Sequence, residues 1–170
     1  MKQERTKVYL GTHTMDDWNI HIASTDQGIC YIGSPNQSRD EVETWIQKNI
    51  SSPYLIVSQA NQQSVVNELQ AYLLGEQEHF TSTLDIIGTA FQQDVWQACQ
   101  LIPYGETRSY SQIAEAIQRP KAVRAVGTAI GANPLLFIIP CHRIIAKDGG
   151  LAGFRAGKDV KKYLLALERK

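Results

Sequence analysis

The spacing of apolar residues changes along this 170-residue chain, and that change constrains the fold more than any other feature. Near the N-terminus, Trp18, Ile20 and Ile22 alternate with polar residues, which is the two-residue period of a half-buried strand. After Thr89 the apolar residues recur every three or four positions, which is the spacing of a helix that buries one side. Strands first and helices later predict an α/β chain of the α+β type.

In the first half we expect a small sheet with helices. Ser38 and Glu41 have the spacing of a capping box, and Gly75 is a typical residue after a helix end. The predicted elements are strands at Lys7–Leu10, Trp18–Ala23 and Gly28–Ile32, a helix beginning after Ser38, and a helix over 60–74. No reactive side chains cluster here, so this half is interpreted as scaffold.

The second half is predicted to be mainly helical. Thr89 with Gln92, and Ser109 with Gln112, are capping pairs that begin two helices. Pro120 suits the first position of a third helix, and two short helices joined by a tight turn suggest a winged-helix-like helix-turn-helix. The predicted helices span about 89–102, 109–117, 120–131 and 158–169, and the last has a stripe of Val160, Tyr163, Leu164 and Leu167.

Charge divides the chain although its net charge is zero. Residues up to Thr81 include 5 basic and 10 acidic side chains, whereas the rest include 12 basic and 7 acidic ones. We therefore predict an N-terminal domain over 1–81 and a C-terminal domain over 82–170 that faces a polyanion. A solvated basic face without a partner is the alternative.

Cysteine usage predicts a reduced, cytoplasmic protein. Cys30, Cys99 and Cys141 are odd in number and widely spaced, which argues against disulfides and a cysteine-built metal site. Cys30 and Cys99 are expected to be packing residues, since each shares a face with apolar neighbours. The first seven residues are too polar for a signal peptide, and the apolar run Leu135–Ile139 is too short to cross a membrane.

The segment Ile139–Ile145, Ile-Pro-Cys-His-Arg-Ile-Ile, concentrates the reactive chemistry. A cysteine attacks as thiolate, and a nearby imidazole promotes that form, so Cys141 is the candidate nucleophile. Neighbours in a regular strand point to opposite faces, but Pro140 favours a bend where both side chains reach one pocket. A buried structural thiol remains the alternative. Glu168 is either a solvated end residue or the partner of a buried imidazole.

The outer face of the third predicted helix has short side chains and two cations. Long charged side chains are the usual filling of a solvated helix face, so small ones indicate that something large approaches the backbone. A DNA groove or a partner protein fits that requirement. The residues on this face are Lys121, Arg124, Ala125, Thr128 and Ala132.

In several short sequence motifs, the second half of the chain resembles the O6-methylguanine-DNA methyltransferase family. The matching strings are Phe-Gln-Gln-Asp-Val-Trp at 91–96, Ile-Pro-Tyr-Gly-Glu-Thr-Arg-Ser-Tyr at 102–110, Arg-Ala-Val-Gly at 124–127, Asn-Pro at 133–134 and Ile-Pro-Cys-His-Arg at 139–143. Their order and spacing are intact over about half the chain, while the first half is only weakly similar to the family's variable N-terminal domain.

The resemblance implies transfer of an alkyl group from the 6-oxygen of guanine in duplex DNA to Cys141, once per chain and without a cofactor. In that family His142 would activate the thiol through a water, Glu168 would orient the imidazole, and Asn133 would tie the helix-turn-helix to the cysteine loop. The implied substrate-binding residues are Tyr110, Ile144 and Arg155. The implied DNA-binding residues are Arg124, which would fill the gap left by the flipped base, together with Ala125, Thr128, Ser111, Gln92 and Arg119.

Some features depart from the family pattern. Phe154 stands where many members have tyrosine and Arg155 where some have serine, which leaves the preferred alkyl size and activity on O4-methylthymine open. The cysteines and histidines of the zinc site found in some relatives are incomplete, so no metal is predicted. A monomer is the default. The alternatives are a non-catalytic sensor of alkylated DNA, a cysteine hydrolase and a sequence-specific helix-turn-helix regulator.

Overall fold

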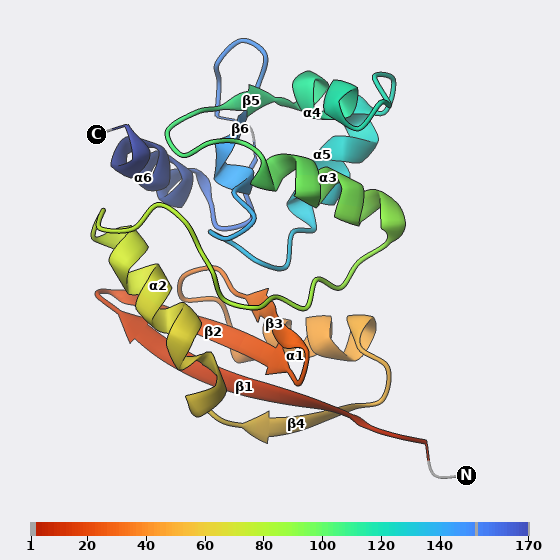
Figure 1. The fold of residues 1–170 in the computed structure, drawn as a ribbon, viewed down its shortest axis with the longest axis vertical. Coiled ribbons are helices and arrows are strands. Elements are labelled where there is room, and N and C mark those ends of the chain that lie inside the picture. The colour runs from red at the N-terminus through yellow and green to blue at the C-terminus, as the bar shows by residue number, and fades with distance from the viewer. Residues whose placement is uncertain (1–2, 152, 170) are drawn as a thin grey trace. The chain divides into compact units, whose positions relative to one another are not determined.

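The computed structural model describes residues 3–151 and 153–169 and divides the chain into two compact units (Figure 1). The first unit ends at Ile87 and the second begins at Gly88, a few residues after the predicted boundary at Thr81. Residues 82–87 stay with the first unit because they bond to it: Leu84 bridges Ile29, and the Thr25 hydroxyl donates to Asp85.

The N-terminal unit is built on a four-stranded sheet in the order β3-β2-β1-β4. Its strands are β1 (Thr6–Met15), β2 (Trp18–Thr25), β3 (Gly28–Ile32) and β4 (Pro53–Val57). The first three pair antiparallel as a meander and confirm the predicted strands, although β1 and β2 are longer than expected. The fourth was not predicted; it pairs parallel with β1 and begins at a proline, which an edge strand tolerates.

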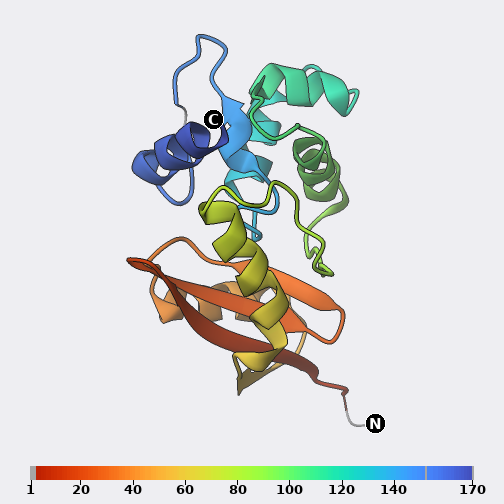
Figure 2. The same ribbon diagram turned by 60° about the vertical axis from the view of Figure 1, so that its left-hand side comes forward.

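Two helices cover opposite faces of this sheet, as Figures 1 and 2 show: α1 (Arg39–Asn49) and α2 (Gln63–Leu73), the latter preceded by the 3₁₀ turn η1 (Ala60–Gln62). On the α1 face a buried apolar cluster forms the core, and Cys30 packs in it as predicted. The cluster contains Val8, Leu10, Ala23, Cys30, Tyr31, Val42, Ile46 and Ile50.

The C-terminal unit is mainly helical, with one small parallel sheet. Its elements are α3 (Ala90–Gln100), β5 (Arg108–Ser109), α4 (Tyr110–Ala116), α5 (Val123–Gly131), the 3₁₀ turn η2 (Cys141–Arg143), β6 (Ile144–Ile145) and α6 (Lys158–Glu168). The pairing of β5 with β6 was not predicted. It joins the entrance of α4 to the segment that follows Cys141, so the helix-turn-helix and the reactive turn share one scaffold.

Both predicted capping boxes are present in this unit. The Thr89 hydroxyl accepts from the Gln92 amide at the start of α3, and the Ser109 hydroxyl accepts from the Gln112 amide at the start of α4. Each glutamine side chain reaches back to the capping residue's own amide. These local bonds fix where the two helices begin.

The predicted start of the third helix at Pro120 was wrong. Pro120 lies in the turn between α4 and α5, and α5 begins three positions later, at Val123. Gln118 has a φ of 61°, and the Arg119 carbonyl accepts from the Ala122 amide, so this turn is closed by its own hydrogen bond before the helix starts. Pro120 therefore belongs to the turn of the helix-turn-helix rather than to its second helix.

The predicted stripe of α6 was wrong at Tyr163, whose side chain is 49% exposed. Lys161 and Glu168 are buried instead, together with Leu164 and Leu165. These positions are three and four residues apart and define a face turned slightly from the expected one. The two charged residues can be buried because each has a polar partner inside the unit. A pattern of apolar residues in the sequence does not reveal such partners.

Candidate active site

The segment Ile139–Ile145 forms a tight turn rather than a strand. Pro140 has φ −80° and ψ 62°, and the next three residues form η2. The Cys141 amide donates to the Ile139 carbonyl at 2.7 Å, and the Arg143 amide donates to the Pro140 carbonyl at 2.9 Å. The bend expected at Pro140 is therefore present, and the three residues that follow it are all buried.

Asn133 holds the Cys141 sulfur. Its Nδ2 donates to the Cys141 Sγ at 3.0 Å and to the Ile139 carbonyl at 2.9 Å. Its Oδ1 accepts from the Leu135 amide at 2.8 Å, which fixes the orientation of the amide group. Asn133 is 1% exposed and lies two residues after the end of α5, so the end of the helix-turn-helix is bonded to the thiol.

His142, the next residue in the chain, forms a second buried pair with Glu168. The His142 Nε2 lies 3.1 Å and 3.2 Å from the two Glu168 carboxylate oxygens, and the imidazole is fully buried. Burial raises the pKa of Glu168, but hydrogen bonds from His142 and Arg143 outweigh it and lower that pKa to about 2. Burial lowers the pKa of His142, against the opposing effect of Glu168. The pair is therefore a carboxylate beside a neutral imidazole at neutral pH.

Arg143 completes this cluster, and the sequence analysis assigned it no role. Its Nε donates to Glu168 Oε1 at 2.8 Å, and its Nη2 donates to the same carboxylate. Its Nη1 donates to the Ile102 carbonyl at 2.7 Å, and the guanidinium lies 5.6 Å from the centre of the Tyr104 ring. The Pro-Cys-His-Arg string contained the residue, but no pattern in the sequence shows which carboxylate it would meet.

Two further cations influence the thiol. Burial raises the pKa of Cys141, while the hydrogen bond from Asn133 and the charges of Arg155 and Lys161 lower it. Lys161 is 1% exposed, and its Nζ donates to the carbonyl of Ile144, a predicted substrate-binding residue. Lys161 was placed on no functional face by the sequence analysis, whereas Arg155 was predicted to contact substrate.

Tyr110 is the first residue of α4, and its ring packs against α5. A Cβ at Gly127 would lie 3.8 Å from two of its ring atoms, so the ring lies beside α5 at van der Waals distance. Burial raises the pKa of Tyr110, and the proximity of Cys141 and Cys99 raises it further. The phenol thus keeps its proton near the thiol. Cys99 itself is fully buried, as expected of a packing residue.

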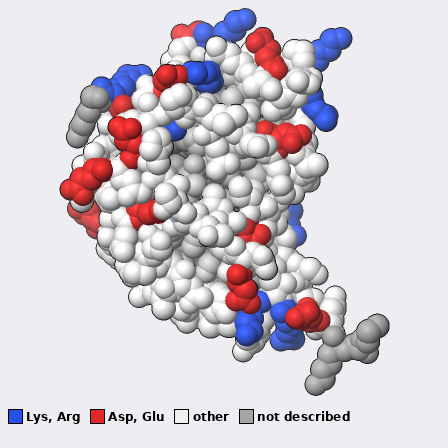
Figure 3. Space-filling view, in the orientation of Figure 1, with Lys and Arg blue, Asp and Glu red and all other residues white. Residues whose placement is uncertain are grey.

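The predicted DNA-binding residues lie on the surface of the C-terminal unit. Arg119, Arg124, Ala125 and Thr128 are exposed, whereas Gln92 and Ser111 are partly buried. The Trp96 indole donates to the Ala129 carbonyl at 2.8 Å and so ties α3 to the buried side of α5. Figure 3 shows Lys and Arg at the edge of this unit with acidic side chains between them, so the basic excess is dispersed over this view.

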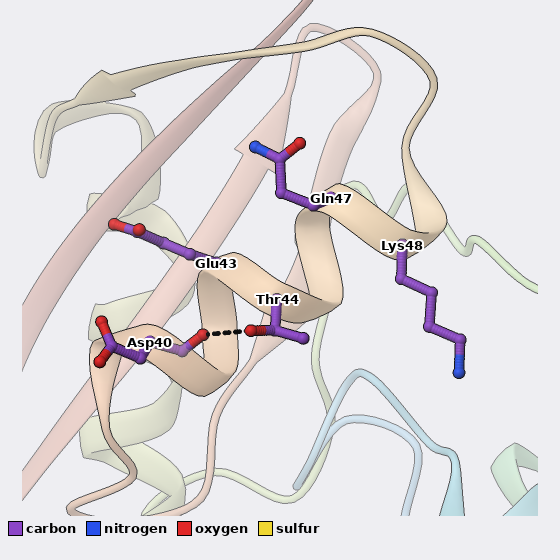
Figure 4. Close-up of a pocket in the computed structure, with 5 residues that line it drawn as sticks. All are labelled: Asp40, Glu43, Thr44, Gln47 and Lys48. Carbon is purple, nitrogen blue, oxygen red and sulfur yellow. Dashed lines mark hydrogen bonds between the residues drawn. The ribbon is translucent and has the colours of Figure 1, made fainter.

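The surface hollow along α1 does not have the features of a site. It measures about 610 Å³ and is lined by Asp40, Glu43, Thr44, Gln47 and Lys48. Figure 4 shows these side chains spread along the helix without meeting at one point, and the Thr44 hydroxyl donates to the Asp40 carbonyl of its own helix. With no converging groups, the hollow is a solvated helix face.

Among residues 3–151 and 153–169, no three or more His, Cys, Asp and Glu side chains gather as a metal site. Within the same residues, every helix is too short or too polar to cross a membrane.

Comparison with known proteins matches both units to one family. The profile described as "6-O-methylguanine DNA methyltransferase, ribonuclease-like domain" matches residues 8–86, and the profile described as "6-O-methylguanine DNA methyltransferase, DNA binding domain" matches residues 90–170. A Bacillus subtilis protein named "Methylated-DNA--protein-cysteine methyltransferase, inducible" is 42% identical over 170 residues, covering all of this chain and 95% of the relative.

Solved structures agree with that match. The crystal structure of Mycobacterium tuberculosis O6-methylguanine methyltransferase is similar with a TM-score of 0.80 and 37% identity, covering 95% of this chain and 93% of the other. The Mycobacterium tuberculosis OGT in complex with DNA has a TM-score of 0.82 and 36% identity, with 95% and 92% coverage.

Proposed function

Since the chain belongs to the 6-O-methylguanine DNA methyltransferase family, we propose that Cys141 is the residue to which it transfers the alkyl group. The protein is a methylated-DNA–protein-cysteine methyltransferase that repairs DNA by moving an alkyl group onto a cysteine of its own chain. One observation supports the choice of residue above others: the Cys141 sulfur accepts a hydrogen bond from Asn133 at 3.0 Å, and the next residue in the chain, His142, pairs with Glu168. Cys30 packs in the apolar cluster of the N-terminal unit, and Cys99 is fully buried.

His142 is proposed to accept the thiol proton. Because burial raises the pKa of Cys141, the thiol keeps its proton until a base removes it. His142 is neutral, and a proton on its Nε2 that donates to Glu168 leaves Nδ1 as the basic nitrogen. The proton passes from Cys141 to His142 through a water, and Glu168 fixes the imidazole and stabilises the charge that it gains.

The transfer itself makes one bond and breaks one bond. The thiolate of Cys141 attacks the alkyl carbon, the bond from that carbon to the 6-oxygen of guanine breaks, and the electron pair leaves on the base. Tyr110 is proposed to donate a hydrogen bond to the departing guanine, since its phenol keeps its proton near the thiol, and the base then takes up a proton from water. The products are a thioether on Cys141 and an unmodified guanine.

DNA contact is proposed for the exposed side of the helix-turn-helix. A base inside the stack cannot reach a buried sulfur, so the nucleotide must be flipped out, which costs a few kcal/mol. Arg124 on α5 is proposed to fill the gap, with Ala125 and Thr128 entering the minor groove. Ser111, Gln92 and Arg119 are proposed to contact phosphates, and Ile144 and Arg155 to hold the base.

Several finer features of the function are part of the proposal. The substrate is O6-alkylguanine in duplex DNA, with O4-methylthymine as a second candidate. The thioether is stable, so each chain acts once, without a cofactor, as a monomer and in the cytoplasm. The free, unpaired state of the three cysteines supports a reducing compartment, because a nucleophilic thiol must stay reduced.

The test is intact-protein mass spectrometry after incubation with a duplex that carries one O6-methylguanine, followed by peptide mapping. We expect one added methyl group per chain, located on Cys141. Cys141→Ala is expected to bind the duplex and gain no methyl group, and Cys99→Ala is the matched control that still gains one. A bound but unmodified wild-type chain would support a damage sensor instead, and a methyl group elsewhere would contradict the assignment of Cys141.

A further inference from the structure

Arg143 takes no part in the proton path above, yet it is 7% exposed and its guanidinium is hydrogen-bonded to two separate segments. Its guanidinium donates to Glu168 on α6, to the Ile102 carbonyl after α3, and lies over the ring of Tyr104. The Tyr104 hydroxyl in turn donates to the Leu167 carbonyl. An arginine fixed on all sides against the carboxylate that orients the imidazole is placed to influence that imidazole.

We propose that Arg143 is a positioning residue that holds Glu168 as a shared anion and thereby keeps His142 neutral, ready to accept the proton of Cys141. This inference rests on the function proposed above, because it assigns Arg143 a role in the same proton transfer. Arg143 touches neither the thiol nor the substrate in this assignment and acts only through Glu168 and its own charge.

The charge balance of the cluster supports this role. Glu168 carries one negative charge and Arg143 carries one positive charge, so the pair is neutral before His142 is considered. A proton on His142 would then add an uncompensated positive charge in a region where the imidazole is fully buried. Without Arg143, the same carboxylate would face His142 alone and would favour the imidazolium. A protonated His142 cannot accept the proton of Cys141.

The other charges around His142 also influence its pKa. The charged and titratable groups that face it are Glu168 and Lys161 from α6, with Cys141 and Arg143 from its own turn. Burial is the largest influence and lowers the pKa of His142, Glu168 raises it, and the charges of Arg143 and Lys161 lower it. Removal of Arg143 therefore takes away one of the two cations that oppose the imidazolium.

The direct test is a titration of His142 by NMR in histidine-labelled protein. The chain has 4 histidines, and the His142 signal is assigned by its loss in His142→Gln. In Arg143→Met, we expect the titration midpoint of His142 to move to higher pH than in the wild type. An unchanged midpoint in a folded Arg143→Met variant would overturn the proposal.

Two further variants keep the test decisive if Arg143→Met is poorly folded. Arg143→Lys keeps the positive charge, so the His142 midpoint is expected to stay close to that of the wild type. Arg143→Met combined with Glu168→Gln removes both charges, and the midpoint is expected to return to low pH because no anion remains to favour the imidazolium. A midpoint that rises as much with lysine as with methionine would show that the charge is not the cause.

Kinetics give a second signature. The rate of methyl transfer in Arg143→Met is expected to be about tenfold lower near pH 6.5 than on its own high-pH plateau. A loss of that size is expected when the titration midpoint of His142 lies about one pH unit above the pH of the assay. The wild type should show a smaller change over the same range. A loss of equal size at every pH would indicate a merely structural arginine and would contradict the proposal.

Arg39→Met is the matched control, since it removes an arginine from an exposed pair with Glu43 in the other unit. The charge of Arg39 lowers the pKa of His21, so the His21 signal should respond while the His142 signal should not. The NMR titration requires no DNA and no alkyl transfer. A shifted His142 midpoint in a protein whose Cys141 takes no methyl group would contradict the proposed function alone.

Discussion

Among the residues that the structure describes, each unit buries one glutamate, and the two carboxylates have different kinds of partner. In the N-terminal unit, Glu68 accepts four hydrogen bonds from the amides and hydroxyls of Thr81 and Ser82, at 2.6–3.2 Å. In the C-terminal unit, Glu168 is bonded to the imidazole of His142 and the guanidinium of Arg143. Glu68 is 8% exposed and Glu168 is 4% exposed, so burial does not distinguish them.

The difference lies in what the partners can do. Thr81 and Ser82 are neutral donors that do not titrate near neutral pH, so Glu68 can only fasten the segment after α2 to its unit. His142 can gain a proton, and the charge of Glu168 decides how readily it does so. Burial raises the pKa of each carboxyl, and in each case hydrogen bonds lower it by more. A buried carboxylate thus gains a chemical role only when one of its partners can change charge.

The largest expected effect separates the two glutamates by activity. Glu168→Gln should slow methyl transfer about 100-fold, since the imidazole loses the anion that stabilises its charged form. Glu68→Gln should leave the rate constant unchanged, because it touches only Thr81 and Ser82. Single-turnover assays with a duplex containing O6-methylguanine measure both. Equal losses in the two variants would remove the functional distinction.

A smaller effect is expected in the pH dependence of stability. The pKa of Glu168 is about 2 in the folded state, below its ordinary value of 4.5. A depressed carboxyl pKa stabilises the fold above pH 4.5, and that stabilisation is lost as the pH falls toward 2. We expect the wild type to lose about 1 kcal/mol per pH unit more than Glu168→Gln in this window.

Urea unfolding at pH 5.5 and pH 3.5 checks this expectation, with Glu68→Gln as the comparison. The pKa of Glu68 is also lowered, so its variant should change the dependence in the same direction. Parallel curves for the wild type and Glu168→Gln across this range would show that the Glu168 carboxyl has no depressed pKa in the folded state.

The smallest effect is expected at Ser82, which donates to Glu68 through its hydroxyl at 2.7 Å. Ser82→Ala should lower the free energy of unfolding by about 1 kcal/mol, because one of four hydrogen bonds to the carboxylate is lost. Methyl transfer should be unaffected. Thermal unfolding and the same single-turnover assay measure the two quantities. A slower methyl transfer in Ser82→Ala would contradict the purely structural role assigned to Glu68.

Local patterns predicted the elements that local bonds create. The capping pairs Thr89–Gln92 and Ser109–Gln112 lie three residues apart, and the three strands of the meander are joined by short turns. Interactions of this kind depend only on near neighbours in the chain. The start of α5 at Pro120 was predicted wrongly for the same reason, since a proline suits a turn as well as a first helical position.

Distant pairings could not be predicted from spacing. Strand β4 is defined by parallel pairing with β1, and β5 is defined by parallel pairing with β6. Neither pair is joined by a hairpin turn that the sequence could indicate. The burial of Lys161 depends on the Ile144 carbonyl that it meets, and the role inferred for Arg143 depends on Glu168, twenty-five positions along the chain. Hydropathy alone assigns both cations to the surface.

The sequence by itself determined the family and the order of the three meander strands and the main helices. It also predicted Cys141 rather than Cys30 or Cys99 as the nucleophile, because motifs and local periodicity depend on residues close together in the chain. Only the tertiary structure decided which charges surround the thiol. A buried charge is stable only when a partner group lies within bonding distance. Arg143 finds its partners in Glu168 on α6 and in the Ile102 carbonyl after α3, and the Cys141 sulfur finds its partner in Asn133 after α5. The electrostatic environment of Cys141 therefore arises from the folded chain rather than from the string of residues around it.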